Sequence, residues 1–476
     1  MSHPRFGGPE VARASGPPDG YCLVMRDRVR MGRDDLLTAI ADGSIDTVIM
    51  AFADHQGRLV GKRTDAAFFV EHVADHGTEN CDYLIARDLD DVPVAGLDVA
   101  SYADGYGDMV AVADWSTVRR LPWSPGTALV ICDLTTTDGS PIGESPRRIL
   151  AEQVATASAA GFSVCVGSEI EFHLFRHSRE VLRANGFRRP DDGSHVQDYD
   201  LAQSAIDEPV IGSLRRSLPG AGVPVEFSKG EAGRGQYEIN LSYADPVEMA
   251  DRNLIFKQAV REVATTAGRA VTFMAKADTD ETGSSCHVHV SLWSPDGSEP
   301  AFDAEPMNDT LRHCLGGLLA TARDFSLLWA PTVNSYRRFQ PASWAPTSIG
   351  WAHDNRTVGF RVVGTGPSSR VECRIPGADA NSHLAFAGVL AGGLHGLRHR
   401  LEPPPAVAGD AHLDTGLPRL PLTLGEAIAA WEASDVAREC FGDAVHRHVA
   451  GHARHEWESF GRAVTDWERQ RYFERI

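Results

Sequence analysis

Four short segments alternate apolar side chains with acids, histidines and arginines. They are "GSEIEFHLF" (167–175), "KGEAGRGQYEINL" (229–241), "SCHVHVSLW" (285–293) and "SRVECRIP" (369–376). Because successive side chains of a β-strand point to opposite faces, each segment has an apolar face and an ionisable face. For a single strand, a solvated face is the simpler explanation. As a set, these faces use Glu, His and Arg instead of Lys, Thr or Gln, which favours one shared site.

The residue types of this set indicate metal-assisted phosphoryl transfer. Several carboxylates with an imidazole form an oxygen-rich donor set that suits Mg²⁺ or Mn²⁺ and is too poor in sulfur and histidine for structural zinc. Arginines beside such an ion fit the oxygens of a phosphate. The sequence contains no P-loop and no Rossmann or kinase glycine loop, so a nucleotide must bind to a less common fold.

Helix and turn signals predict the elements that position these strands. Ser145-Pro146 begins a helix that ends at Gly161, and Asp245-Pro246 begins one that ends at Gly268. The runs "DTVIMAF" and "RLVGKRT" flank the turn "ADHQG" and predict a hairpin over 46–64. A further strand is expected in "AVTFMAKA" (270–277), and a long loop over 401–421. The predicted fold class is α+β, with helices against a sheet.

The prolines and glycine of "LPWSPG" (121–126) place a domain boundary near 125. We therefore expect three parts. They are a flexible tail over 1–20, a β-rich N-terminal domain over 21–125 and a catalytic domain over 126–476.

Composition narrows the class of protein. Across 476 residues, 46 basic and 65 acidic side chains give a net charge of -19, which disfavours nucleic acid and anionic membranes as partners. The eight cysteines form no C-x-x-C pair and are interpreted as reduced core residues. No stretch has the roughly 18 continuous apolar residues of a membrane helix, and the N-terminus lacks the apolar core of a signal peptide. A cytoplasmic location is expected.

From about Asp46 to Ile476, the chain resembles the glutamine synthetase family. The matching segments are, in family order, "SEIEFHLF", "GEAGRGQYEI", "FMAKADTDETGSSCHVHVS", "NSYRRFQP", "DNRTVGFR" and "SRVECRIPGADANSHL". The segments "GYGDMVAVADWSTVRRLPW" and "DWERQRYFERI" resemble the branch that joins glutamate to amines. The resemblance implies a β-grasp N-terminal domain and a catalytic domain with a curved antiparallel sheet. It also implies a dodecamer of two hexameric rings with active sites at subunit junctions.

The resemblance also assigns roles residue by residue, with ATP as a substrate and two or three Mg²⁺ or Mn²⁺ ions per site. The ligands of the metal near the acyl acceptor would be Glu171, Glu231 and Glu238. Those of the metal near the nucleotide would be Glu169, His287 and Glu372. Nucleotide contacts would come from His289, Ser291, Arg361 and Arg370. Glutamate would be held by Thr282, Gly283, Arg338, Arg356 and Arg374. Arg338, Arg356 and Arg361 would also act in catalysis, the last two beside the transferred phosphate. His173 matches no ligand and is interpreted as a polar neighbour.

Departures from the family pattern bear on the nitrogen substrate. Ammonia-using members carry a glutamate in a flexible flap, at the position where this chain has Trp344. We therefore expect Trp344 to line a pocket for an amine. The family's Asn-Gly-Ser-Gly loop is "TGSS" here, with Thr282 for Asn, and only Asp82 could replace the N-terminal aspartate that reaches a neighbouring site. The loop 406–421 has no tyrosine for adenylylation.

The implied reaction is ATP-dependent ligation of the γ-carboxylate of glutamate to an amine through γ-glutamyl phosphate. An organic amine, either a small monoamine such as ethanolamine or a polyamine, is favoured over ammonia. The alternatives are an ordinary glutamine synthetase, a non-catalytic ring-forming scaffold and a guanidino kinase.

Overall fold

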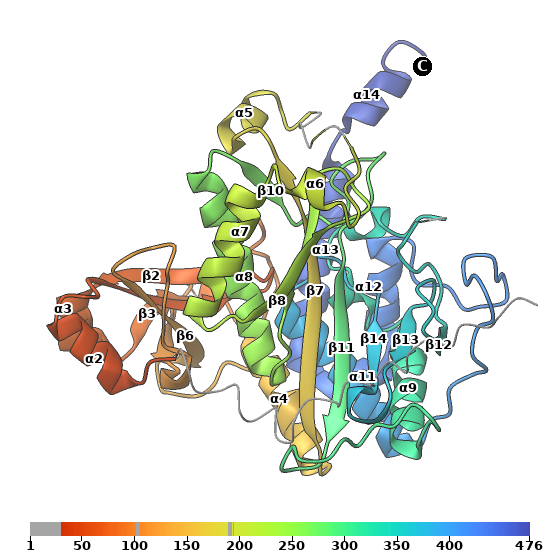
Figure 1. The fold of residues 1–476 in the computed structure, drawn as a ribbon, viewed down its shortest axis with the longest axis horizontal. Helices are drawn as coiled ribbons and strands as arrows, with labels where there is room; N and C mark the ends of the chain where they lie inside the picture. The colour runs from red at the N-terminus through yellow and green to blue at the C-terminus, as the bar shows by residue number, and fades with distance from the viewer. Residues whose placement is uncertain (1–29, 101–104, 189–192, 194, 342) are drawn as a thin grey trace, which may run out of the picture.

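The computed structural model describes residues 30–476 except 101–104, 189–192, 194 and 342. The flexible tail expected over 1–20 lies outside the described residues. Two sheets dominate, and the first lies to one side of the larger second sheet (Figure 1). No helix in the described part of the chain is both long and apolar enough to cross a membrane.

The first sheet has the strand order β2-β1-β6-β4-β3, and β5 also pairs with β6. Its strands are β1 (Thr47–Ala53), β2 (Leu59–Asp65), β3 (Thr78–Cys81), β4 (Asp108–Ala113), β5 (Arg119–Arg120) and β6 (Thr127–Thr136). The predicted hairpin is confirmed, because β1 and β2 pair antiparallel from Thr47 opposite Asp65 to Ala53 opposite Leu59. Helix α2 (Arg33–Ala41) buries Leu36 against this sheet, beside Phe52 and Phe69.

The domain boundary near 125 stays a prediction, but the strand that follows it belongs to the first sheet. The apolar run "TALVICDL" forms β6, which pairs in parallel with β1 and antiparallel with β4. Since β6 is central to the first sheet, it is buried on both faces and has no alternating pattern. We propose that the first unit extends to at least Thr136.

The second sheet has the strand order β12-β13-β14-β11-β7-β9-β8, and β10 also pairs with β7. Its strands are β7 (Ser163–Phe175), β8 (Val225–Gly230), β9 (Gln236–Leu241), β10 (Ala270–Thr272), β11 (Cys286–Trp293), β12 (Trp351–His353), β13 (Phe360–Val363) and β14 (Arg370–Cys373). All pairs are antiparallel except β12 with β13, so the expected antiparallel sheet is mixed at one edge. The strand expected over 270–277 is shorter and ends at Thr272.

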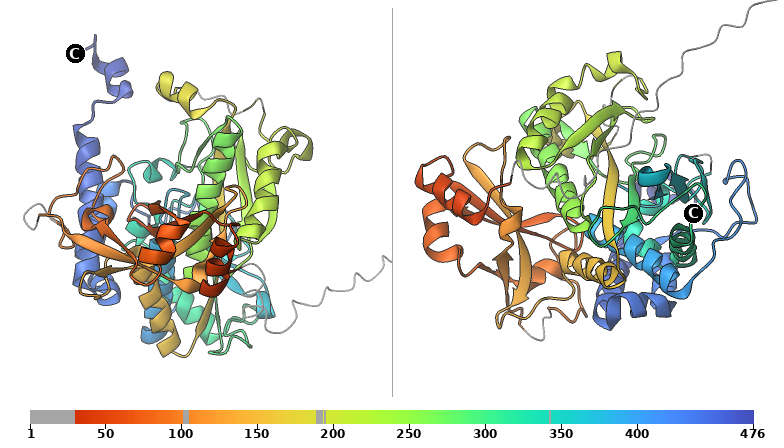
Figure 2. Two further views of the ribbon diagram at one scale, coloured as in Figure 1. Left: turned by 90° about the vertical axis from the view of Figure 1, so that its left-hand side faces the viewer. Right: turned by 60° about the horizontal axis from the view of Figure 1, so that its bottom comes forward.

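Long helices cover the apolar face of the second sheet. They are α4 (Pro146–Ala159), α8 (Pro246–Thr266), α9 (Asp309–Thr321), α11 (Ser382–His399), α12 (Leu424–Ala433) and α13 (Asp435–Arg462). Helices α4 and α8 contact β7, and α11 packs on α4, α8 and α9 (Figure 2). The side chains of Ile170 and Phe172 on β7 belong to this core. The fold class is therefore α+β, as predicted.

Shorter elements complete the chain. The helices are α3 (Ala66–Phe68), α5 (Arg179–Ala184), α6 (Leu201–Ser204), α7 (Glu208–Ser217), α10 (Ser326–Trp329) and α14 (Asp466–Tyr472). The short 3-10 and π turns are η1 (Phe69–Val73), η2 (Asp82–Ile85), η3 (Trp115–Thr117), η4 (Leu218–Ala221), η5 (Ser335–Arg337) and η6 (Gly366–Ser368).

The two predicted helix starts are confirmed. Asp245 caps α8 by accepting hydrogen bonds from the backbone of Val247 and Glu248, and Pro246 is the first helical residue. Gly161 and Gly268 follow α4 and α8 with φ of 86° and 69°, a conformation that favours glycine. The loop expected over 401–421 contains no helix or strand among its residues, all of which are described. Cys165 is disulfide-bonded, which corrects the expectation that all cysteines are reduced.

Candidate active site

Strand register brings the four ionisable faces together. Glu171 on β7 lies opposite Glu238 on β9, and Glu169 lies opposite His287 on β11. On the other side of β11, His289 lies opposite Glu372 of β14. Facing residues in an antiparallel pair are close neighbours, so adjacent strands alone assemble the acids and imidazoles.

The first carboxylate group consists of Glu171, Glu231 and Glu238, each with an oxygen within 4.8 Å of the others. The Ser285 backbone N–H donates to Glu171 at 2.8 Å and fixes its orientation. Burial raises the pKa of Glu238 to about 10, and repulsion by Glu169 adds to this effect. Buried carboxylates that repel one another need a compensating cation, and this all-oxygen set fits Mg²⁺ or Mn²⁺.

Lys229 is a neighbour of this group that sequence reasoning missed. Its ammonium forms an ion pair with Glu231 and lies 3.8 Å from Glu238. It also lies 4.7 Å from the centre of the Tyr199 ring. The lysine stands two residues before Glu231 at the end of β8, a spacing that could have pointed to the pair.

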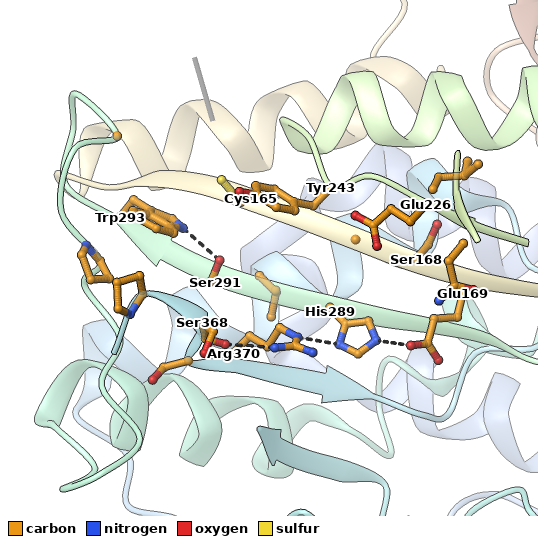
Figure 3. A pocket seen from close by; sticks show the side chains of 18 of the residues that line it. Cys165, Ser168, Glu169, Glu226, Tyr243, His289, Ser291, Trp293, Ser368 and Arg370 are labelled. Carbon is orange, nitrogen blue, oxygen red and sulfur yellow. Dashed lines mark hydrogen bonds and ion pairs between the residues drawn. The ribbon is translucent and has the colours of Figure 1, made fainter. Parts of the chain in front are cut away.

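The second group consists of Glu169, His289 and Glu372, whose ligand atoms also lie within 4.8 Å of one another. The predicted His287 is close too, with Nδ1 3.1 Å from Glu169 and 3.5 Å from Glu372. His289 joins a chain in which Arg370 Nε donates to its Nδ1 at 3.2 Å and its Nε2 lies 3.0 Å from Glu169 (Figure 3). Both histidines therefore face the same carboxylates.

Glu372 is fully buried and held between two guanidinium groups. Arg361 Nη1 donates to it at 2.9 Å and Arg374 Nη1 at 2.5 Å. Burial raises the pKa of this carboxyl group, but His287 and Arg374 outweigh that effect and lower it to about 2. Arg361 also forms an ion pair with Asp354. Glu372 is thus a permanent anion near the centre of the sheet.

Two cavities meet at these groups. The larger, of about 580 Å³, runs over β11 and the start of β14 and is lined by Tyr243, His289, Ser291 and Arg370 (Figure 3). The smaller has a volume of about 410 Å³. The linings of both include Glu169, Phe227 and Asn240, so the cavities adjoin where the carboxylates converge.

The structure brings nearly all predicted site residues to these cavities. The smaller cavity is lined by Glu169, Glu171, Glu231, Glu238, Thr282, Gly283, His287, Arg338, Trp344, Arg356 and Arg374. The larger has His289, Ser291 and Arg370 together with Glu169. Arg361 and Glu372 line neither cavity and reach the site through their contacts with each other and with His287.

Trp344 and Asp82, two of the positions that depart from the family pattern, lie apart. The Trp344 side chain is 62% exposed and borders the smaller cavity. Asp82 begins η2 beside the first sheet, where its carboxylate accepts a hydrogen bond from the Gly107 backbone at 2.9 Å. It is absent from the described linings of both cavities of its own chain. His173 is buried beside Ser284 and belongs to neither carboxylate group.

Gly283 is required because Arg338 passes directly over it. A Cβ at this position would lie 2.7 Å from Cγ of Arg338 and 2.8 Å from the Ala275 carbonyl oxygen. The Arg338 guanidinium is fixed in turn by the carbonyl groups of Ile375 and Arg374, at 2.7 and 3.0 Å. The Arg338 side chain therefore could not move away from a Cβ at position 283.

We expect Gly283→Ala to lower kcat/KM for the substrate of the smaller cavity by about 10–100-fold, since misplacing a binding group by about 1 Å has this cost. Steady-state kinetics measure the effect. Gly143→Ala is the matched control, because its Cβ would meet nothing within 4 Å. Equal kinetics for both variants would show that Arg338 does not need its observed position.

The fold and the paired carboxylate groups define a class of protein. A family model described as the glutamine synthetase catalytic domain matches residues 143–472, and the chain belongs to this family. The gamma-glutamylethanolamide synthetase GlnA4 of Streptomyces coelicolor is 44% identical over 463 residues, 97% of this chain and 100% of that protein. A glutamate–isopropylamine ligase of a Pseudomonas species is 34% identical, covering 91% of this chain and 96% of that protein.

A solved structure is similar across nearly the whole chain. The ligand-free structure titled "Apo GmaS without ligand" has a TM-score of 0.81 and 27% sequence identity, and covers 92% of this chain and 99% of that one. The same protein is also known in complex with ADP, at the same TM-score.

Proposed function

We propose that this protein is an ATP-dependent ligase that joins the γ-carboxylate of glutamate to an organic amine. The observation that carries the proposal is the junction of the two cavities at Glu169, with carboxylates between a nucleotide-sized cavity and a smaller one bordered by arginines and Trp344. The similarity to ligases for ethanolamine and isopropylamine supports the amine class.

The reaction would proceed in two displacements. An oxygen of the glutamate γ-carboxylate attacks the terminal phosphorus of ATP, the bond from that phosphorus to the bridging oxygen breaks, and ADP leaves. The amine nitrogen then attacks the γ-carbonyl carbon. The C–N bond forms, the C–O bond to phosphate breaks, and phosphate and a proton are released.

The chain's own residues would bind and orient the reactants. Arg370 and Ser291 would contact the nucleotide in the larger cavity, whereas Arg338 and Gly283 would position glutamate in the smaller one. Arg356 and Arg361 would balance the charge that develops on the transferred phosphate. Arg374, which donates a hydrogen bond to Glu372, would help to hold glutamate in the smaller cavity.

The two carboxylate groups would hold divalent cations, Mg²⁺ or Mn²⁺. Glu171, Glu231 and Glu238 would bind one ion. Glu169 and Glu372, with His287 or His289, would bind the other. When bound, such ions polarise the phosphoryl group and neutralise charge during its transfer. We further propose that the protein acts as a cytoplasmic dodecamer of two hexameric rings.

Trp344 would select the amine. An exposed indole in place of a flap carboxylate offers no anionic partner for ammonium, but it packs well against the carbon chain of an amine and attracts an organic ammonium to its ring face. A small monoamine fits better than a polyamine, whose distant charge needs a second carboxylate.

An amine panel tests the proposal. Purified protein with ATP, Mg²⁺ and glutamate is expected to release phosphate at least about 10-fold faster with ethanolamine or a small alkylamine than with equal ammonium, the discrimination that one pocket can supply. Release with ammonium alone would identify an ordinary glutamine synthetase instead. An absence of release with every amine would favour a scaffold, and release on arginine or creatine without glutamate would indicate a guanidino kinase.

A further inference from the structure

Three histidines meet far from the carboxylate groups. His448 and His452 lie one turn apart on one face of α13, and His55 lies in the turn between β1 and β2. Each offers a ring nitrogen, and these nitrogens lie within 4.8 Å of one another. The ring of His55 stacks on that of His452 with centroids 3.8 Å apart, and His448 is 4.7 Å from His452.

Three ring nitrogens of this cluster lack partners within the described part of the chain. His448 is only 3% exposed, yet neither of its ring nitrogens has a hydrogen bond, and Nδ1 of His55 has none either. Buried polar atoms without partners are uncommon and need an explanation. Two rings with such atoms, in contact with a third imidazole, are more than hydrophobic packing requires.

His452 is arranged like a metal ligand. Its Nε2 lies 3.2 Å from the carbonyl oxygen of Ile85, which accepts a hydrogen bond from that nitrogen. A ring that donates through Nε2 carries its lone pair on Nδ1, and such a backbone contact is the usual way in which proteins fix a ligating imidazole.

We propose that His55, His448 and His452 form a binding site for a divalent transition-metal ion, with Zn²⁺ as the preferred ion. Three neutral imidazoles suit Zn²⁺, whereas they are poor ligands for Mg²⁺. The stacked arrangement of His55 and His452 must open for both rings to reach one ion. The fourth position is left for solvent from an adjoining cavity of about 500 Å³ that both rings line.

The site would link the first sheet to α13. His55 belongs to the hairpin of the first sheet, whereas α13 packs with the catalytic core. A nearby contact also joins α13 to the N-terminal part of the chain, since Nε2 of His455 lies 3.0 Å from the Asp88 carboxylate. An ion held by both elements stabilises the folded state by mass action, because the unfolded chain holds no preformed site.

The test is a zinc titration of the full-length protein with saturating Mg²⁺ present, so that the carboxylate groups are already occupied. After treatment with a chelator, the wild type is expected to bind about one Zn²⁺ per chain, and bound Co²⁺ should show the visible absorption of a tetrahedral nitrogen site. Zn²⁺ should also raise its thermal midpoint.

Matched variants separate this site from others. His448→Phe fills the same space without a ligand and is expected to lose the ion, the Co²⁺ absorption and the rise in thermal midpoint. His55→Ala, in the turn between β1 and β2, provides the same test if His448→Phe fails to fold. Glu238→Gln and His395→Gln should retain the ion, since one alters the carboxylate group and the other a separate histidine pair. Absence of Zn²⁺ binding by the wild type, or full binding by His448→Phe and His55→Ala, would overturn the proposal.

Discussion

Glu238→Gln is expected to reduce turnover by about 10³-fold or more while leaving the fold and the proposed dodecamer intact. The loss follows because an amide removes one anionic ligand from a group of three carboxylates that would hold a catalytic cation. Phosphate release in the presence of ATP, glutamate and an amine measures it. The thermal midpoint without divalent ions should not fall, since Glu238 is a buried acid repelled by its neighbours.

The matched control is Glu79→Gln, the same change at an exposed position on β3 of the first sheet. This variant should keep wild-type activity. Size-exclusion chromatography and calorimetry of both proteins separate a loss of chemistry from a loss of structure. If Glu238→Gln kept more than a tenth of the activity, or if its oligomer fell apart, the assignment of Glu238 to a metal site would be wrong.

Trp344→Glu is expected to shift specificity toward ammonium. The ratio of kcat/KM for ammonium to that for the preferred organic amine should rise by about 10–200-fold, the range that one pocket contact can control. A carboxylate at this position would attract ammonium and accept its proton, whereas the lost indole would no longer contact the carbon chain of an amine. Competition kinetics with both nitrogen sources measure the ratio.

Two control variants accompany the Trp344→Glu substitution. Trp344→Phe keeps an aromatic ring and should keep the amine preference. Trp467→Glu makes the same substitution on α14, where the side chain is 60% exposed and lines neither cavity. It should leave the ratio unchanged. An unaltered preference in Trp344→Glu would mean that other residues choose the amine.

The carboxylate groups could be predicted because period-two alternation is a local property. Glu169 and Glu171 share a face of one strand, and the register with β9 and β11 then brings Glu238 and His287 beside them. The difference between His287 and His289 could not be predicted in this way, since both lie on the same face. The structure shows that this ring also faces Glu169, because its Nε2 lies 3.0 Å from a Glu169 oxygen.

The features that could not be predicted depend on contacts between residues that are far apart in the sequence. The run that forms β6 has no alternation, so nothing local shows that it pairs in parallel with β1 across 80 residues of chain. The strand after α8 ends at Thr272, because beyond it the chain leaves β7 and enters the loop that carries Gly283. The histidine cluster joins a turn near residue 55 to a helix near residue 450, a separation that no spacing rule covers.

The most direct test of the central claim is the identity of the product formed in competition. The enzyme is supplied with ATP, Mg²⁺, glutamate and equal concentrations of ethanolamine and ¹⁵N-labelled ammonium, and the products are analysed by mass spectrometry. We expect γ-glutamylethanolamide as the main product, with one ADP and one phosphate released per amide bond. Labelled glutamine as the main product would contradict it.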